Sequence, residues 1–176
     1  MLNQDSCAFL IIDIQEKLLR SVYNADEVLK NSVILAKAGR ELGLRTLVTE
    51  QYPKGLGTTV EALRAEIDGQ FFEKNAFSAL ECRELYEALD GVKEVVLFGI
   101  ETHICVYQTA CALLEKGFDV TVAVNACSTR DEFEHLQAVE NFRQMGVSAK
   151  TVEMILFELL KSSKHPSFKT VQGLIK

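Results

Sequence analysis

The fold of this chain is decided by residues 95–106, which read Val95-Val96-Leu97-Phe98-Gly99-Ile100-Glu101-Thr102-His103-Ile104-Cys105-Val106. The first part is a continuous apolar run of strand length, and apolar or small residues then recur at helical spacing as far as Gly117. Continuous apolar strands are typical of parallel sheets that helices cover on both faces. This stretch therefore predicts a buried strand, a tight connection and a helix that packs against the sheet.

The same alternation of short apolar runs and longer helical patterns recurs along the chain. The predicted strands are Ala8 to Asp13, Thr46 to Glu50, Gln70 to Glu73, Val95 to Gly99, Val120 to Asn125 and Ser148 to Thr151. The predicted helices are Ala25 to Leu42, Cys82 to Leu89, His103 to Lys116, Glu132 to Met145 and Val152 to Leu160. We expect one domain over residues 1–176 with an α/β fold, a three-layer α/β/α sandwich around a mainly parallel, Rossmann-like sheet of about six strands.

The composition limits the partners and the location of the chain. It has 176 residues with 19 basic and 25 acidic side chains, for a net charge of −6, so we expect no nucleic-acid partner. The longest apolar runs are strand-sized, far below the roughly 18 residues that a membrane span needs. No basic segment precedes the first apolar run, and Asp13 interrupts that run, so we expect no signal peptide and a cytoplasmic location.

The cysteines and histidines do not form a metal or disulfide pattern. Five cysteines are an odd number without Cys-x-x-Cys spacing, which argues against a disulfide framework and against a structural zinc. The three histidines, His103, His135 and His165, lie far apart in the sequence. We therefore expect no metal and no cofactor, and each cysteine is by default a small buried hydrophobe.

Ligands of open α/β sheets bind at the carboxyl ends of the strands, and two of the predicted strand ends carry opposite charges. Asp13 ends the first strand, where it is either a helix N-cap or a general base. Lys74 follows an apolar strand, where it is either a solvated charge or an ammonium drawn to the edge of the sheet. In the second case it would pair with Asp13 and lower the pKa of the Cys105 thiol.

Cys105 is the best nucleophile candidate in the chain. Thr102 is placed to act as a helix N-cap, which puts Cys105 in the first turn. There the unpaired backbone N–H groups and the positive end of the helix dipole stabilise a thiolate and can receive an oxyanion. The alternative is an inert buried thiol, which is our interpretation of Cys111.

The motifs around these three residues together resemble the isochorismatase-like cysteine hydrolases, a superfamily that includes nicotinamidases, N-carbamoylsarcosine amidohydrolases and isochorismatases. The resemblance runs in order through Asp13-Ile14-Gln15, Glu73-Lys74-Asn75-Ala76-Phe77-Ser78 and Gly99-Ile100-Glu101-Thr102-His103-Ile104-Cys105-Val106. It implies that Cys105 is the nucleophile, that Asp13 is the general base and that Lys74 is the cation that holds the pair in charged form. It also implies a non-proline cis peptide between Ile100 and Glu101.

The activity that this resemblance implies is hydrolysis of a small amide or related C–N bond through a thioester intermediate. The backbone N–H groups of Glu101 and Cys105 would form the oxyanion hole. The expected lining of the substrate pocket is Gln15, Leu18, Tyr52 and Phe77. Aromatic walls with few fixed charges suit a compact neutral substrate. Family members usually form dimers or larger assemblies, so we expect a homo-oligomer.

One stretch departs from the nicotinamidase pattern. Nicotinamidases follow the second strand with an Asp-x-His metal motif, whereas Thr49-Glu50-Gln51-Tyr52-Pro53-Lys54-Gly55-Leu56-Gly57 contains no histidine. A nicotinamidase-type metal site is therefore not expected. The sequence of this stretch instead resembles that of the isochorismatase-domain-containing branch of the superfamily.

Three other functions stay open at this point. A non-catalytic binding or assembly module is disfavoured because the Asp13, Lys74 and Cys105 set is complete. A doubly wound nucleotide-binding domain is disfavoured because its glycine fingerprints are missing. An isochorismatase-type vinyl ether hydrolase needs several positive groups for a dicarboxylate substrate, and the candidate pocket stretches offer few beyond Lys54 and Arg130.

Overall fold

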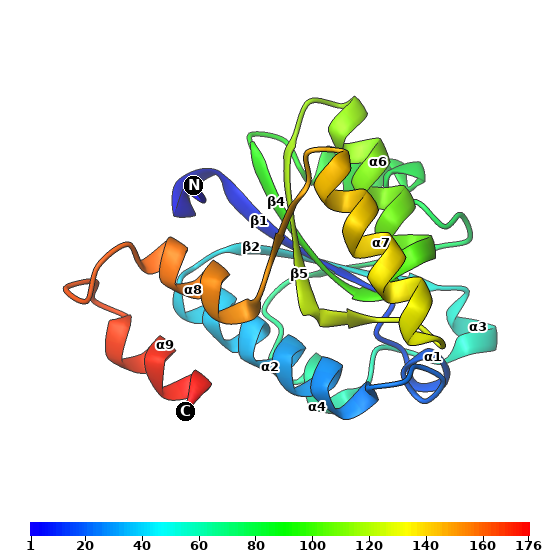
Figure 1. Cartoon of the computed structure of the whole chain (residues 1–176), viewed down its shortest axis with the longest axis horizontal. Coiled ribbons are helices and arrows are strands. Elements are labelled where there is room, and N and C mark those ends of the chain that lie inside the picture. Colours follow the sequence, from blue (N-terminus) through cyan, green and yellow to red (C-terminus); the bar gives the residue numbers. More distant parts are fainter.

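A computed structural model describes all residues 1–176 and contains one six-stranded, entirely parallel sheet (Figure 1). The strands are β1 (Cys7–Ile12), β2 (Arg45–Gln51), β3 (Gln70–Lys74), β4 (Glu94–Ile100), β5 (Asp119–Ser128) and β6 (Ser148–Lys150). Their order in the sheet is β3-β2-β1-β4-β5-β6. The order reverses between β1 and β4, as in Rossmann-type sheets. The predicted Rossmann-like sheet is therefore confirmed.

Helices cover both faces of the sheet, which confirms the predicted three layers (Figure 1). One face carries α2 (Ala25–Glu41), α4 (Glu61–Arg64), α8 (Val152–Leu160) and α9 (Phe168–Ile175). The other carries α5 (Arg83–Glu87), α6 (Tyr107–Glu115) and α7 (Glu132–Gln144). The remaining short helical segments are η1 (Gln4–Ser6), α1 (Glu16–Leu19), α3 (Pro53–Leu56), η2 (Ala79–Glu81) and η3 (Thr102–Val106).

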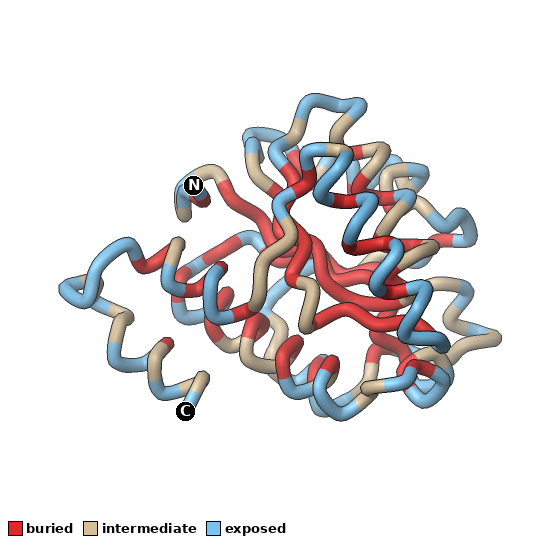
Figure 2. Tube along the Cα trace, viewed as in Figure 1, coloured by how far each residue is buried: buried red, intermediate tan, exposed pale blue.

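The core lies along the two central strands, β1 and β4. Every residue of β1 is buried, as is every residue of β4 after Glu94, and Figure 2 shows this buried band in red between the helical layers. Phe9 and Phe98 meet edge to face across the two strands, with ring centroids 5.9 Å apart. Burial on both faces explains why these strands are continuous rather than alternating in apolar character.

The C-terminal segment docks on the body of the protein. Residues 168–175 form α9, which packs against α2 and buries Val171 completely. The ring of Phe168 lies 6.3 Å from that of Phe157 on α8. No helix in the structure is both long and apolar enough to cross a membrane.

The turn that carries Cys105 differs from the expected helix start. Residues 102–106 form a π-helical turn, in which the Val106 N–H donates to the Glu101 carbonyl at 3.3 Å. The predicted N-cap role of Thr102 is wrong, because its hydroxyl lies 2.9 Å from Nδ1 of His135 on α7 instead of capping the turn. The Ile100–Glu101 peptide bond is cis, as the resemblance implies.

Gly99 lets β4 pass close to β1 at the point where the strand order reverses. It pairs with Ile12 in the sheet and has a φ of +133°. A Cβ at this position would lie 2.0 Å from the Ile12 carbonyl oxygen. Backbone cannot move aside as a flexible side chain can, so only glycine fits here.

We therefore expect Gly99→Ala to lower the free energy of unfolding by about 2–4 kcal/mol. Gly173→Ala is the matched control, because Gly173 lies in a helix with open space around its Cα. It should change stability by no more than about 1 kcal/mol, in the stabilising direction. Urea unfolding at equilibrium measures both, and a Gly99→Ala protein as stable as the parent would contradict the close approach.

Candidate active site

The candidate site lies at the carboxyl edge of the sheet, at the reversal of strand order. Asp13 directly follows β1, and Cys105 lies in η3, directly after the neighbouring strand β4. Asp13 is fully buried and has a left-handed backbone with φ 51°. Aspartate tolerates that conformation better than most residues. Its N–H donates to the Thr49 carbonyl on β2 at 3.2 Å, which fixes its place beside the sheet.

Lys74, the last residue of β3, reaches over β2 to Asp13. Its Nζ lies 2.7 Å from Asp13 Oδ2, and the Lys74 side chain is only 2% exposed. The ammonium also donates to Gln51 Oε1 at 2.7 Å and to the carbonyls of Ala76 and Phe77 at 3.2 Å. A buried ion pair persists only when its remaining hydrogen-bonding groups are satisfied, and these contacts satisfy the ammonium.

Cys105 completes the cluster, with 7% of its surface exposed. Burial raises the pKa of its thiol to about 12, the Asp13 charge adds to that effect, and the Lys74 ammonium opposes it. Lys74 lowers the pKa of the Cys105 thiol as expected, but desolvation and the carboxylate together outweigh the ammonium, so the net shift is upward. The resting thiol is neutral at physiological pH, so a base must accept its proton during any reaction.

Three of the four predicted pocket-lining residues are at least partly exposed. Tyr52 and Phe77 are 54% and 52% exposed, and Leu18 on α1 is partly buried. Tyr52 donates its N–H to the Lys74 carbonyl at 2.9 Å, and Phe77 offers its carbonyl to the Lys74 ammonium. Two aromatic rings therefore stand beside the backbone that holds the buried cation.

Gln15 is the fourth of the predicted pocket-lining residues. It is fully buried, and its Nε2 donates to the carbonyls of Gln51 at 2.9 Å and Gly57 at 2.6 Å. Its Oε1 accepts from the Gln51 N–H at 2.6 Å. Both amide N–H bonds are thus in use. Gln15 therefore fastens the loop after β2 to the sheet, and its role in lining a substrate pocket stays a prediction.

Residues 49–51 surround the site in a way that the sequence did not reveal. Thr49 donates its hydroxyl to Asp13 Oδ1 at 2.7 Å, and Gln51 contacts Lys74. Glu50 between them turns away and binds Thr59 and Arg64, at 2.7–3.0 Å. The available signal was a run of three polar residues at the carboxyl end of a buried strand, in which the first and third share one face because side chains alternate along a strand. The structure brings together no three His, Cys, Asp or Glu side chains suited to a metal ion.

Glu101, at the start of the turn that carries Cys105, is held by a cation. Its Oε1 accepts from Nε of Arg130 at 3.0 Å and from the Arg130 backbone N–H at 3.2 Å. The Glu101 side chain is 11% exposed and that of Arg130 is 65% exposed. This pair joins the end of β5 to the turn that carries the nucleophile candidate.

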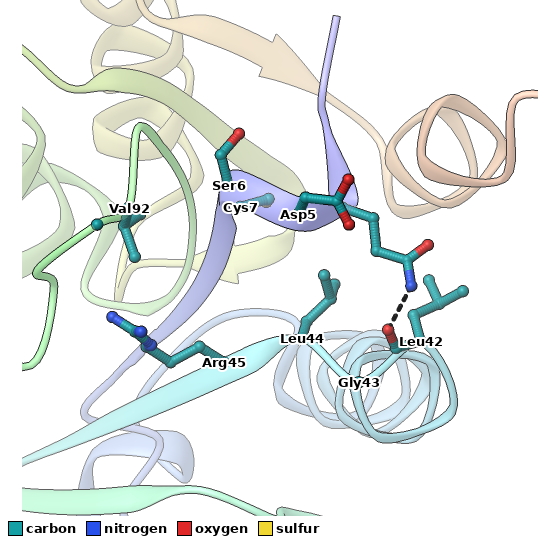
Figure 3. Close-up of a pocket in the computed structure, with 10 residues that line it drawn as sticks. Asp5, Ser6, Cys7, Leu42, Gly43, Leu44, Arg45 and Val92 are labelled. Carbon is teal, nitrogen blue, oxygen red and sulfur yellow. Dashed lines mark hydrogen bonds between the residues drawn. The ribbon is translucent and has the colours of Figure 1, made fainter.

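A separate hollow of about 390 Å³ lies at the other edge of the sheet (Figure 3). It is lined by residues at the amino ends of β1 and β2, such as Ser6, Cys7 and Arg45. Ligand sites of open α/β sheets lie at the carboxyl ends. The hollow is therefore distinct from the candidate site.

Comparison with known proteins identifies the family to which the chain belongs. The family model described as the isochorismatase domain matches residues 7–154 of this chain. The chain belongs to the isochorismatase family. Isochorismatase domain-containing protein 2 of Xenopus laevis is 38% identical over 176 residues, which cover 99% of this chain and 85% of the relative. Isochorismatase domain-containing protein 1 of Danio rerio is 34% identical, and the match covers 99% of this chain but 62% of that relative.

Solved structures of other isochorismatase-fold proteins superpose closely on this family member. A structure described as the MAR1 ribonuclease from Caenorhabditis elegans has a TM-score of 0.96 and 38% identity, with 99% of this chain and 91% of that chain covered. The YcaC protein from Escherichia coli, described as an octameric hydrolase of unknown specificity, has a TM-score of 0.88 and 24% identity, with 99% and 94% covered. The second match shows the shared fold alone.

The buried ion pair predicts strong coupling between its two members. Lys74→Met leaves the Asp13 charge buried without its counterion, so the free energy of unfolding should fall by about 3–5 kcal/mol. Adding Asp13→Asn should restore part of that loss, since the double variant has no unpaired charge. A double-mutant cycle in urea at pH 7 measures the coupling.

The exposed pair of Arg83 and Glu87 provides the control for this cycle. Arg83→Met should change stability little, because exposed ion pairs contribute little. Strictly additive losses in the Asp13 and Lys74 variants would show that the two charges do not interact in the folded protein.

Proposed function

We propose that this isochorismatase-family protein is a cysteine-dependent hydrolase of a small amide or related C–N bond. Cys105 is the nucleophile, Asp13 the general base and Lys74 the cation that holds the base in its charged form. The observation that carries the proposal is the contact of 2.7 Å between Lys74 Nζ and Asp13 Oδ2, buried beside the Cys105 thiol. A carboxylate, an ammonium and a thiol are buried together at the carboxyl edge of the sheet. Packing alone does not require such a cluster, and clusters of this kind are typical of catalytic sites.

The first step joins proton transfer to attack. The thiol is neutral at rest because its pKa is raised to about 12 by burial, so Asp13 accepts the proton as Cys105 Sγ bonds to the carbonyl carbon. The π electrons of the carbonyl move to its oxygen and give a tetrahedral oxyanion. The N–H groups of Glu101 and Cys105 are assigned to that oxyanion.

The second half of the cycle returns the enzyme to its starting state. The oxyanion collapses, the C–N bond breaks, and the leaving amine takes the proton that Asp13 received. Water then gives a proton to Asp13 and attacks the thioester carbon. A second collapse releases the carboxylic acid and returns the proton to Cys105, so one amide and one water give one acid and one amine.

The rim of the site favours a compact neutral substrate. The backbones of Tyr52 and Phe77 bond Lys74, and both residues are more than half exposed, while the ammonium of Lys74 is already bound to Asp13. We assign Leu18, a partly buried residue of α1, to the same lining. We therefore assign a small molecule as the partner. A cytoplasmic location and self-association stay predictions.

Ribonuclease activity is the second candidate, because a relative with 38% identity is described as a MAR1 ribonuclease. RNA backbones attract basic surfaces, whereas this chain carries a net charge of −6. The cysteine hydrolase proposal therefore ranks first. Incubation of labelled single-stranded RNA with the parent protein and with Cys105→Ala tests the alternative in the same assay series.

The hydrolase proposal predicts acyl transfer to one cysteine. Incubation with a panel of small amides should release ammonia or amine, and intact-protein mass spectrometry after acid quenching should find an acyl group on Cys105. Cys105→Ala should abolish both signals. Cys111→Ala, on the helix that follows, should keep both. Amide hydrolysis that persists in Cys105→Ala would overturn the nucleophile assignment.

The base role of Asp13 predicts a characteristic pH profile for modification of Cys105 by acrylamide, a small neutral electrophile. The rate should rise with an acid-side midpoint, reach a plateau through neutral pH, and rise again toward pH 12 as the thiol, whose pKa burial raises to about 12, ionises. Asp13→Asn should remove the plateau and leave the alkaline rise. Residue-resolved mass spectrometry measures the rates, and a plateau retained in Asp13→Asn would exclude Asp13 as the base.

A further inference from the structure

β2 lies between the two strands whose ends carry the charged groups. It pairs with β1, where Thr49 is opposite Ile12, the residue before Asp13. It pairs with β3 on its other side, where Gln51 is directly opposite Lys74. Because alternate residues of a strand share a face, Thr49 and Gln51 point to the same side while Glu50 points to the other. The strand thus brings one neutral polar side chain to each member of the ion pair.

Thr49 holds the carboxylate oxygen that Lys74 does not use. Its hydroxyl donates to Asp13 Oδ1 at 2.7 Å, whereas Lys74 binds Oδ2. The other acceptor near the hydroxyl, the Ile11 carbonyl, is at 3.5 Å, and Thr49 is fully buried. The single hydroxyl proton is therefore directed at Asp13, which fixes the plane of the carboxylate.

Gln51 provides the Lys74 ammonium with a second acceptor besides Asp13. Its Oε1 accepts from Lys74 Nζ at 2.7 Å, and its Nε2 donates to the Asn75 carbonyl at 2.7 Å. Donation to a carbonyl settles which end of the amide faces Lys74. Its backbone N–H and carbonyl are both held by the Gln15 amide, so the whole residue is fixed.

We propose that Thr49 and Gln51 are positioning residues that hold Asp13 and Lys74 in their charged forms and in line with Cys105. The proposal rests on the proposed function in taking Asp13 as the base. A hydrogen bond to the charged form of a group favours that form. A neutral residue at position 51 also leaves Asp13 as the counterion of Lys74, whereas a carboxylate there would compete for the ammonium.

Few groups contact the Asp13 carboxylate, so the effect of removing one of them can be predicted. Lys74 from β3 and Cys105 from η3 are its titratable or charged neighbours in these contacts, and Thr49 is its neutral donor. Loss of the Thr49 hydroxyl should make the protonated form of Asp13 more favourable. Thr49→Val should therefore move the acid-side midpoint of the acrylamide profile upward by about one pH unit.

Two further threonine variants separate positioning from packing. Thr49→Ser keeps the hydroxyl and should return the midpoint toward that of the parent protein. Thr46→Val is the matched control, since Thr46 is a buried residue of the same strand whose hydroxyl bonds the Leu44 carbonyl instead. An unmoved midpoint in Thr49→Val, or an equal shift in Thr46→Val, would overturn the assignment of Thr49.

Gln51→Met should lower the plateau rate about tenfold, because Lys74 loses an acceptor and its alignment with Asp13. Gln4→Met is the control, since the Gln4 amide donates to the Leu42 carbonyl at the other edge of the sheet, beside the hollow of Figure 3. An unchanged plateau in Gln51→Met would overturn the role of Gln51.

An NMR titration of carbon-labelled aspartate carboxyls separates this proposal from the proposed function, because it needs neither alkylation nor substrate. An upward move of the Asp13 midpoint in Thr49→Val supports positioning even if the parent protein shows no acrylamide plateau, in which case the base role fails alone. An Asp13 midpoint that stays in place rejects positioning. If Thr49→Val does not fold, Thr49→Ala carries the same test.

Discussion

The ion pair between Lys74 and Asp13 is the constraint on which the carboxyl edge of the sheet depends. Two opposite charges removed from water are stable only together and only with their remaining hydrogen bonds satisfied. The side chain of Lys74 is 2% exposed and that of Asp13 is fully buried. Meeting this demand recruits the carbonyls of Ala76 and Phe77 and the amide of Gln51. The backbone of the loop after β3 is consequently held in place by its hydrogen bonds to the Lys74 ammonium.

The chemistry of the site follows from the same burial. Desolvation favours the neutral thiol of Cys105, and the Asp13 charge adds to that preference. A stable resting thiolate would be the expected state if Lys74 dominated, but the ammonium is already committed to Asp13. The structure therefore favours a neutral thiol at rest, and the proposed mechanism accordingly moves the proton to Asp13 during attack. The isochorismatase fold itself does not decide this, since one fold can carry several chemistries.

Much of the fold and the charged members of the site were predictable because their signals are local. Continuous apolar runs identified the strands, and two charged residues stood out against them, Asp13 after Ile12 and Lys74 at the end of β3. Ligand sites of open α/β sheets lie at the carboxyl ends of the strands, where the strand order reverses. This general rule predicted that Asp13 and Cys105, distant in the sequence, would lie close together. What could not be predicted depends on contacts across strands. The Thr102 hydroxyl hydrogen-bonds to His135. Both N–H groups of the Gln15 amide donate to carbonyls of Gln51 and Gly57, at the end of β2 and in the loop after it.

Thr49 and Gln51 show the same limit most clearly. Their roles come from register, since one position along β2 decides which residue faces Asp13 and which faces Lys74. A shift of one residue would exchange Thr49 and Gln51 for Glu50 on that face. The direction of the pKa shift of the Cys105 thiol also depends on its burial in the folded protein. A position in the first turn of a helix does not by itself reveal that burial.

Phe77 contributes to the site through its backbone and through its side chain, and these two contributions can change independently in evolution. Its carbonyl holds the buried ammonium, while its ring stands more than half exposed at the rim. Tyr52 is similar, because its N–H bonds the Lys74 carbonyl and its ring is also exposed. Every residue type has the carbonyl that position 77 supplies, and every type except proline has the N–H that position 52 supplies, so neither contact depends on an aromatic side chain. The surface that these side chains present can therefore change among descendants of this chain while the contacts that hold the buried ammonium are inherited intact.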